Sequence, residues 1–266
     1  MNTKEKRIHN LSRLGLSFER GGAHLARTMM LRELQALLAC ADTENAQKSD
    51  YLDAIEIDNC LGKRSGRTRK LTAKHLADLY ALDPSVTIFR ALHYYWKRDP
   101  KAQPLLALLC AYARDSVLRS SAPLIVHTDH GKEILKVDME SYIDTQYPSR
   151  FSKATLESTV RNISSTWTQS GHLSGRVHKI RSRAEATPGS VSYALFLGYI
   201  TGARGPALFE TEYAKLLDCP KESAIEMAVE ASRRGWMVFK RVGKVMEALF
   251  PNLLTAGDQE LIHEQG

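Results

Sequence analysis

The stretch FSKATLESTVRNISSTWTQSGHLSGRVHKIRSR, from Phe151 to Arg183, carries the clearest fold signal in the chain. Ser152 is a good N-cap for a helix that runs to about residue 170. The apolar residues of this helix recur on one face at helical spacing: Leu156, Val160, Ile163 and Trp167. Gly171 then ends the helix, and Gly175 opens a basic strand or loop. We therefore expect a helix followed directly by a short hairpin.

The face opposite this apolar stripe consists almost wholly of small polar side chains. Its members are Ser158, Arg161, Asn162, Ser165, Thr168 and Gln169. Ser and Thr are mediocre helix formers, so helix propensity does not explain them. Hydroxyl and amide groups can hydrogen-bond to phosphate oxygens or base edges of a nucleic acid. They can also pack one helix against another or form a protein-binding surface, so three interpretations stay open.

The order helix, glycine, apolar residue and basic hairpin is typical of a winged helix-turn-helix, in which the recognition helix precedes the wing. Residues 136–152 would then supply the preceding helix and the turn. Under this interpretation the nucleic-acid-binding residues of the segment are Lys153, Arg161, Asn162, Ser165, Thr168, Gln169, Arg176, Lys179, Arg181 and Arg183.

Two further basic clusters lie elsewhere in the chain. GKRSGRTRKLTAK, residues 62–74, contains no acid, and we expect a flexible loop that contacts phosphates, with Thr72 capping the next helix. A merely solubilising loop is the alternative. SRRGWMVFKRVGKV, residues 232–245, resembles a second helix-to-wing junction whose Trp236 and Phe239 belong in the core. The candidate phosphate contacts here are Lys63, Arg64, Arg67, Arg69, Lys70, Lys74, Arg233, Arg234, Lys240 and Arg241.

Composition favours a folded globular protein with an anionic partner. The 266 residues are 43% hydrophobic and 25% charged, with a net charge of +7. Four widely spaced cysteines without a CxxC pair indicate buried thiols in a reducing compartment. The N-terminus has no secretory signal, and no apolar run approaches the roughly 20 residues of a membrane helix. We expect a cytoplasmic protein that does not contact membranes.

Nearly every apolar pattern has the helical period, which predicts an all-α, two-lobed multi-helix bundle with helix-turn-helix-like segments. Any sheet should be a small hairpin near residues 174–183 or 236–242. A first long helix should follow Gly21 and Gly22. SAPLIVHTDHG, residues 121–131, should interrupt the helical pattern and divide an N-terminal domain, residues 1–122, from a C-terminal domain, residues 123–266, that contains the winged-helix-like segment.

No pattern of residues predicts catalysis. The chain contains no P-loop, GxGxxG, GxSxG or HExxH motif. His127, Asp129 and His130 lie close together but lack a second set of metal ligands. We therefore expect a non-enzymatic protein without a metal or cofactor.

Several segments together resemble the BrxA-like proteins of bacteriophage-exclusion (BREX) defence systems. They are SFERGGAHL (17–25), LTAKHLADLYALDPSVTIFRALHYYW (71–96), ALLCAYARDSVLR (107–119), FSKATLESTVRNISSTWTQSGHL (151–173) and YALFLGYITGARGPALFETEY (193–213). The resemblance implies an all-helical, non-enzymatic DNA-binding protein that works with other phage-defence proteins. The family has also been likened to helical RNA-binding antitermination factors, which keeps RNA open as the ligand. It supplies no binding residues.

The sequence thus predicts a protein that binds nucleic acid, with duplex DNA favoured, mainly through phosphates. The helix from Ser152 would lie in or beside a groove, with Arg176–Arg183 on one flanking backbone and Lys63–Lys70 on another. If two basic clusters share a face, roughly six to eight phosphates would be neutralised. A scaffold that docks other defence proteins would instead need large exposed apolar anchors. An RNA-binding regulator would need exposed aromatic side chains for base stacking.

Overall fold

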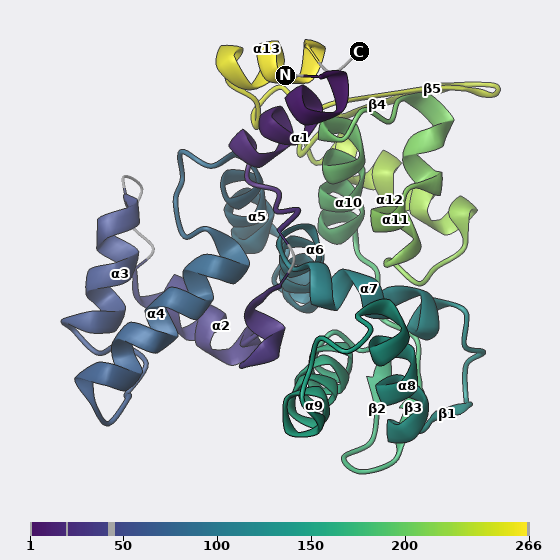
Figure 1. Cartoon of the computed structure of the whole chain (residues 1–266). Helices are drawn as coiled ribbons and strands as arrows, with labels where there is room; N and C mark the ends of the chain where they lie inside the picture. Colours follow the sequence, from purple (N-terminus) through teal and green to yellow (C-terminus); the bar gives the residue numbers. More distant parts are fainter. Residues whose placement is uncertain (1, 20, 42–45, 265–266) are drawn as a thin grey trace.

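The structure of the chain, a computed structural model, describes residues 2–19, 21–41 and 46–264. It is mostly helical, as the periodicity predicts, and two small antiparallel sheets accompany the helices (Figure 1). Within these ranges no helix is both long and apolar enough to cross a membrane.

The described residues form α-helices, 3-10 helices and short strands. The α-helices are α1 (Thr3–Arg13), α2 (Leu31–Cys40), α3 (Lys48–Glu56), α4 (Gly66–Tyr80), α5 (Thr87–Arg98), α6 (Gln103–Arg114), α7 (Ser116–Val126), α8 (Lys136–Gln146), α9 (Lys153–Gln169), α10 (Pro188–Ile200), α11 (Glu212–Lys215), α12 (Lys221–Arg233) and α13 (Ala256–His263). The 3-10 helices are η1 (Ala23–Leu25), η2 (Pro100–Ala102) and η3 (Gly205–Glu210). The strands are β1 (Glu133–Ile134), β2 (Leu173–Ser174), β3 (Lys179–Arg181), β4 (Val238–Val242) and β5 (Val245–Leu249).

The core is built around α6 and α10, which contact each other and α5. Both helices are buried on nearly all sides, as their continuous apolar sequences predict. Tyr193 and Phe196 of α10 stack with their ring centroids 6.5 Å apart, and Phe250 meets Phe196 edge-on at 5.3 Å. One connected cluster of buried residues runs from the N-terminal helices to α13.

Two helix predictions in the N-terminal half are wrong. The residues after Gly22 form only the short η1, and α2 begins at Leu31 because Met30 adopts a left-handed conformation with φ of 53°. The segment from residue 62 is not a loop that leads to a cap at Thr72. Ser65 caps α4 by accepting the N–H of Thr68, and Thr72 lies buried in the middle of that helix.

The stretch predicted to interrupt the helices is helical at its start. α6 ends at Arg114, and the side chain of Asp115 caps α7 by accepting the N–H groups of Val117 and Leu118. From there α7 runs through Pro123, because the burial of its apolar face holds the helix together across the missing N–H. The predicted domain boundary between residues 122 and 123 lies inside this helix.

Residues 116–181 have the element order helix, strand, helix, helix, strand, strand. β1, β3 and β2 form an antiparallel sheet in the order β1-β3-β2, with Glu133 opposite Ile180 and Leu173 opposite Arg181. The predicted helix from Ser152 is present as α9, and the predicted small hairpin follows it as β2 and β3. Gly171, with φ of 87°, makes the left-handed turn between them.

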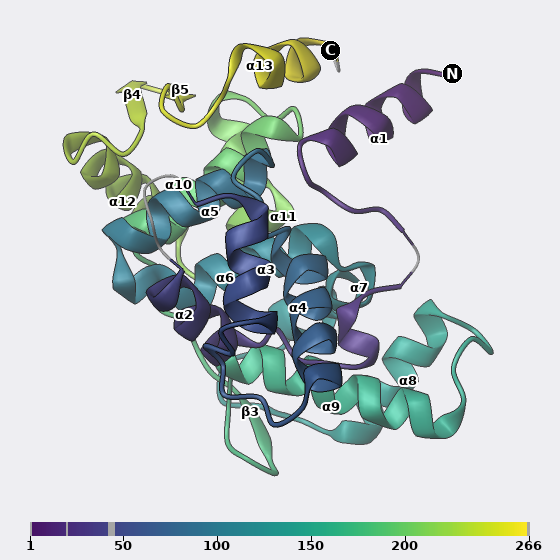
Figure 2. The same cartoon turned by 90° about the vertical axis from the view of Figure 1, so that its left-hand side faces the viewer.

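A second hairpin, β4–β5, follows α12 at the other predicted hairpin position, with Val242 opposite Val245 beside the turn. The two views in Figures 1 and 2 place the β2–β3 hairpin and the β4–β5 hairpin at opposite ends of the molecule. α1 and α13 contact each other at the β4–β5 end.

A buried ion pair joins β3 to the connection between α11 and α12. The Arg181 guanidinium donates to both carboxylate oxygens of Asp218, at 2.7 and 2.8 Å, and to the backbone carbonyl of Ile125 at 2.8 Å. Burial would raise the pKa of Asp218, but hydrogen bonds from Arg181 and from the Ala184 N–H hold this pKa below its usual range. The ion pair therefore fixes the β2–β3 hairpin against the segment that joins α11 to α12.

His172 should make the fold sensitive to mild acid. Burial lowers its pKa to about 4, and its Nε2 contacts the Leu216 carbonyl at 3.0 Å. As the pH falls from about 6.5 to about 4, the unfolded chain binds a proton that the folded chain does not, so stability is lost. We expect a fall of roughly 3 kcal/mol in the free energy of unfolding over this range.

Urea unfolding at a series of pH values between about 7 and 4.5 measures this loss. His172→Gln cannot titrate, so its free energy of unfolding should vary much less over the same range. An equally steep dependence in the variant would assign the effect to other groups.

Candidate nucleic-acid interface

A groove of about 710 Å³ lies between α9, the β2–β3 hairpin and the start of α8. Ile134, Met139 and Val160 contribute apolar surface to its lining. The predicted binding residues that line it come from both α9 and the hairpin: Arg161, Ser165, Thr168, Gln169, Arg176 and Lys179. The structure therefore brings a large part of the predicted α9 and hairpin set together around one concave surface.

The small polar face of α9 divides into two strips with different neighbours. One strip packs against residues 24–31: Thr166 Oγ1 contacts His24 Nε2 at 2.8 Å and accepts the Met29 N–H at 2.8 Å. Asn162 donates to the His24 carbonyl, and Gln169 accepts the Leu31 N–H. Asn162 and Gln169, predicted as nucleic-acid contacts, thus hydrogen-bond within the protein. The packing interpretation explains this strip.

The second strip faces the groove. Arg161 is exposed there, and no described residue forms an ion pair with it. Ser164 and Ser165 are half-buried beside it. Thr168 donates to the Ser164 carbonyl at 2.8 Å, as expected for a threonine inside a helix. The strip offers one free guanidinium and short hydroxyl groups on a surface that another macromolecule can approach closely.

Lys179 ties the hairpin to α9. Its ammonium donates to Thr168 Oγ1 at 3.0 Å and to the Gly175 carbonyl at 2.7 Å. Partial burial lowers the pKa of this lysine. Lys179 thus holds the hairpin in place, and the contribution we expect from it is positioning more than phosphate neutralisation.

The hairpin turn places two exposed side chains at the groove. Gly175 has φ of 87°, and a Cβ there would lie 2.1 Å from the His178 carbonyl oxygen, so only glycine fits. Arg176 is exposed, and Val177 is 81% exposed next to it. His178 contacts Glu133 of β1 at 2.7 Å, which braces the far side of the turn.

Arg181, predicted as a phosphate contact, does not belong to the interface. Its side chain is 2% exposed because it bonds to Asp218 and to backbone carbonyls. A guanidinium that is buried and paired in the interior cannot be reached by a phosphate. Arg183, two residues further on, is exposed without an ion-pair partner among the described residues, as is Lys153 at the start of α9.

The first basic cluster lies mainly on α4 instead of a loop. Lys63 pairs with Glu33 at 3.0 Å, and Lys74 pairs with Asp78 at 2.7 Å. Arg69 is half-buried. The exposed members without an ion-pair partner in the described part of the chain are Arg64, Arg67 and Lys70.

These cations surround a helix start that has no acidic residue in its first turn. A helix N-terminus carries positive partial charge, so each cation there costs about 0.3–1 kcal/mol at low ionic strength. A bound anion would offset that cost.

The third cluster is partly neutralised. Glu230 forms ion pairs with Arg234 at 2.8 Å and with Arg233 at 3.9 Å. Lys240 lies 3.9 Å from Glu247 on the neighbouring strand. Arg241 is exposed. Phe239 is buried against Phe209, as predicted, while Trp236 is half-buried and the Arg234 guanidinium lies over its ring.

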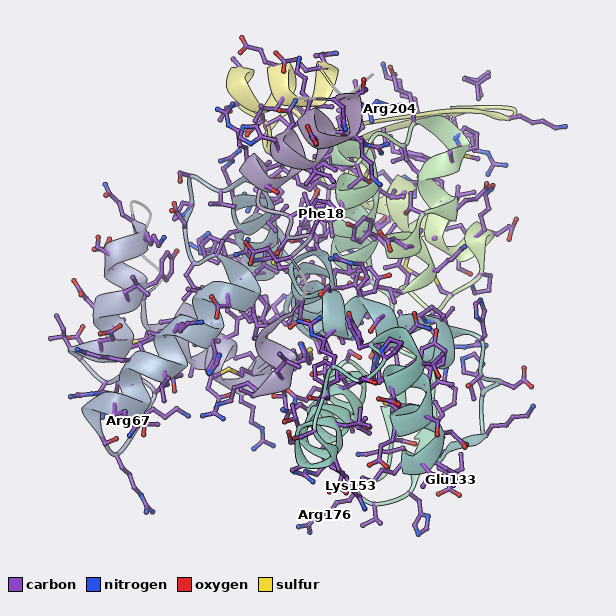
Figure 3. All side chains as sticks on the ribbon, viewed as in Figure 1. Phe18, Arg67, Glu133, Lys153, Arg176 and Arg204 are labelled. Atoms are coloured by element: carbon purple, nitrogen blue, oxygen red, sulfur yellow. The ribbon has the colours of Figure 1, made fainter. Side chains whose placement is uncertain are left out.

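The clusters do not share one surface. Figure 3 shows Arg67, Lys153 and Arg176 toward the same end of the molecule. The β4–β5 hairpin, which carries Lys240 and Arg241, lies at the other end in both cartoon views (Figures 1 and 2). Arg67 of the first cluster thus lies toward the end of the molecule that carries α9 and its hairpin, and the third cluster lies at the other end.

The sequence interpretation missed the start of α8, where Leu135, Lys136 and Met139 line the groove. These residues could have been predicted, because the helix before the turn of a helix-turn-helix packs beside the helix that follows it. No Phe, Tyr or Trp lines the groove, and Phe18 is the one exposed side chain of these three types among the described residues.

A buried polar chain supports α9 from behind. Asp115 accepts the His24 N–H and contacts its ring Nδ1 at 2.8 Å, and the same ring reaches Thr166. Burial would raise the pKa of Asp115, but the contacts with His24 hold this pKa below its usual range. All three side chains are buried. The chain therefore links η1, α7 and α9 as a structural support.

The arrangement offers free cations and short hydroxyl groups around a groove, which suits hydrogen bonding to an extended anion. In the part of the chain that the structure describes, no three His, Cys, Asp or Glu side chains are grouped to hold a metal ion. The chain matches no protein-family model and no curated protein.

Proposed function

We propose that this protein binds duplex DNA, without catalysis, through a winged helix-turn-helix formed by residues 116–181. The element order helix, strand, helix, helix, strand, strand, with the sheet order β1-β3-β2, carries the proposal. In such a unit the third helix enters the major groove and the hairpin contacts the flanking backbone. Here the third helix is α9, and the hairpin is β2–β3.

The groove side of α9 suits this role. The major groove is about 12 Å wide and admits an α-helix. Arg161 would point to a base edge or a phosphate, and Ser164 and Ser165 would let the helix approach closely. Arg176, at the hairpin turn, would contact the flanking phosphates. Arg161 and Arg176 line the same groove, which supports their acting on one ligand.

The start of α4 would hold a second backbone segment. Arg64, Arg67 and Lys70 gather at the positive end of a helix, where a phosphate is stabilised both by their charge and by the helix dipole. The position of Arg67, toward the same end of the molecule as Lys153 and Arg176, supports a shared ligand (Figure 3).

A cytoplasmic role in a bacterial phage-defence system completes the proposal. It rests on the sequence resemblance to BrxA-like proteins. DNA binding would place the protein where other defence proteins act on the same DNA.

Two observations favour duplex DNA over the alternatives. RNA-binding proteins that read single strands stack many bases on Phe, Tyr and Trp, and Phe18 is the one exposed side chain of these three types among the described residues. A scaffold would present large anchors, whereas the exposed apolar residues around the groove are Leu135 and Val177.

The test is binding of the purified protein to duplex DNA across a salt series. With roughly six to eight phosphates neutralised, the logarithm of the association constant should fall with the logarithm of salt concentration with a slope of about −5 to −7. Duplex RNA and single-stranded RNA of the same sequence should bind more weakly. Absence of duplex DNA binding at low salt, or preference for single-stranded RNA, would contradict the proposal.

A further inference from the structure

The β4–β5 hairpin projects from the molecule at the end opposite the α9 unit. Figure 1 shows it as a long arm whose tip extends beyond α10 and α12. Its base is anchored, because Phe239 and Ala248 are buried and Phe239 packs on Phe209. A Cβ built on Gly243, in the turn, meets no atom within 4 Å. The base of the arm is therefore fixed and its tip is uncovered.

The tip of the hairpin combines exposed apolar side chains with exposed cations. Val242 and Val245 are paired across the turn and are 80% and 72% exposed. Val242 is the last residue of β4 and Val245 is the first residue of β5, and a two-residue turn that begins with Gly243, φ of 58°, joins them. Valine is stiff about χ1, so the pair forms a small rigid apolar point.

Cations surround this point. Arg241 precedes Val242, and Lys244 lies between the two valines in the turn, both exposed. Lys240 is one step further down the arm. Glu247, opposite Lys240, is the one acidic side chain in either strand. The tip therefore has an apolar centre with a positive rim.

We propose that the tip of the β4–β5 hairpin inserts into the minor groove of DNA and kinks it. Apolar side chains that wedge between base steps from the minor groove unstack them and bend the duplex away, while neighbouring Arg and Lys hold the phosphates. Val242 and Val245 supply the wedge, and Arg241 and Lys244 supply the phosphate contacts. The inference rests on the proposed DNA binding and adds a second contact to it.

The positive charge of the β4–β5 hairpin favours duplex DNA over a second protein as the partner of its tip. A docking strand for another chain, or for a second copy of this one, would place a cationic rim against a surface that must be acidic. Duplex DNA is acidic along its whole length, and this chain carries a net charge of +7. The separation of the arm from α9 fits a bent or wrapped duplex, since a bend brings more DNA onto the protein.

The experiment measures DNA bending directly. A duplex with a flexible TA step at its centre carries donor and acceptor dyes at its ends, and energy transfer is compared with and without the full-length protein. Wild type should produce a kink of roughly 20–90°, seen as increased energy transfer at saturating protein. Val242→Ser/Val245→Ser should abolish the increase. Val242→Leu/Val245→Leu, which keeps the wedge apolar, should retain it.

Ile57→Ser is the matched control, because Ile57 is an apolar residue 70% exposed just after α3 and its loss should leave the kink unchanged. Binding without a kink in wild type would overturn the inference and leave the proposed function standing. An unchanged kink in the serine variant would also overturn it, as would a change of oligomeric state in that variant with the kink intact. Absence of duplex binding by wild type would overturn the proposed function itself.

Discussion

Replacing Arg161 and Arg176 together with glutamate should weaken duplex DNA binding by at least about 30-fold at moderate salt. Loss of one arginine at a DNA interface costs about 1–3 kcal/mol, and two such losses give at least about 2 kcal/mol, to which charge reversal adds repulsion. The two residues come from α9 and from the hairpin turn but line the same groove. The expected effect is large because both arginines would contact the same DNA.

The variant should fold normally. Both arginines are exposed, and neither forms an ion pair with a described residue, so their replacement leaves no buried partner unsatisfied. Fluorescence anisotropy with labelled duplex measures the dissociation constant, and circular dichroism verifies the fold.

Lys4→Glu/Arg13→Glu is the control that separates a site from general attraction. Both residues are exposed on α1, at the other end of the molecule, and the change in net charge is the same. We expect a reduction well below that of the groove variant. Equal losses in the two variants would show that DNA responds to net charge alone, and the winged helix-turn-helix assignment would then be wrong.

The sequence predicts α9 and its hairpin because their signals are local. Ser152, the four-three-four spacing of apolar residues and Gly171 lie within one segment, and the structure contains that helix and hairpin. β1 escapes prediction because it has only two residues, and its pairing with Ile180 closes a loop of nearly fifty residues. A strand of that length has no alternation to detect.

The use of each polar residue on α9 could not be predicted from α9 alone. Thr166 and Asn162 face residues 24–31, more than a hundred positions earlier, and Arg161 faces the groove. Nothing in the helix sequence distinguishes the two strips. The same limit explains Arg181: Arg176 and Arg183 in the same basic run are exposed, but Asp218 pairs with Arg181 from another element.

α4 shows how a cap signal can be misassigned. Ser65 and Thr72 are both acceptable N-caps, and the density of charge from residue 63 to 70 favours a loop. The helix nevertheless begins at Gly66 because its inner face, with Thr72 and Leu76, is buried against the core. Tertiary packing outweighs the unfavourable charge at the helix start.

Replacing Asp218 with alanine should lower the free energy of unfolding by about 3–5 kcal/mol, the cost of leaving a buried charge without its partner. Asp218 and Arg181 are 9% and 2% exposed, so water cannot replace the lost carboxylate. The carbonyls of Ile125 and His172 still solvate the guanidinium, which favours the lower part of this range. Urea unfolding at pH 7 measures the change.

Asp129→Ala is the matched control. Asp129 also has an ion pair, with Lys132 at 2.6 Å, but both side chains are well exposed, so its loss should cost less than about 1 kcal/mol. Arg181→Met/Asp218→Leu removes both charges and should recover most of the stability that Asp218→Ala loses.

A loss below about 1 kcal/mol in Asp218→Ala would mean that the pair does not hold β3 in place. Recovery in the double variant, by contrast, would show that the cost comes from an unpaired buried charge. The hairpin would then owe its position to a contact outside the winged unit, since Asp218 lies between α11 and α12. DNA contacts by Arg176 would depend on the other half of the molecule for their geometry.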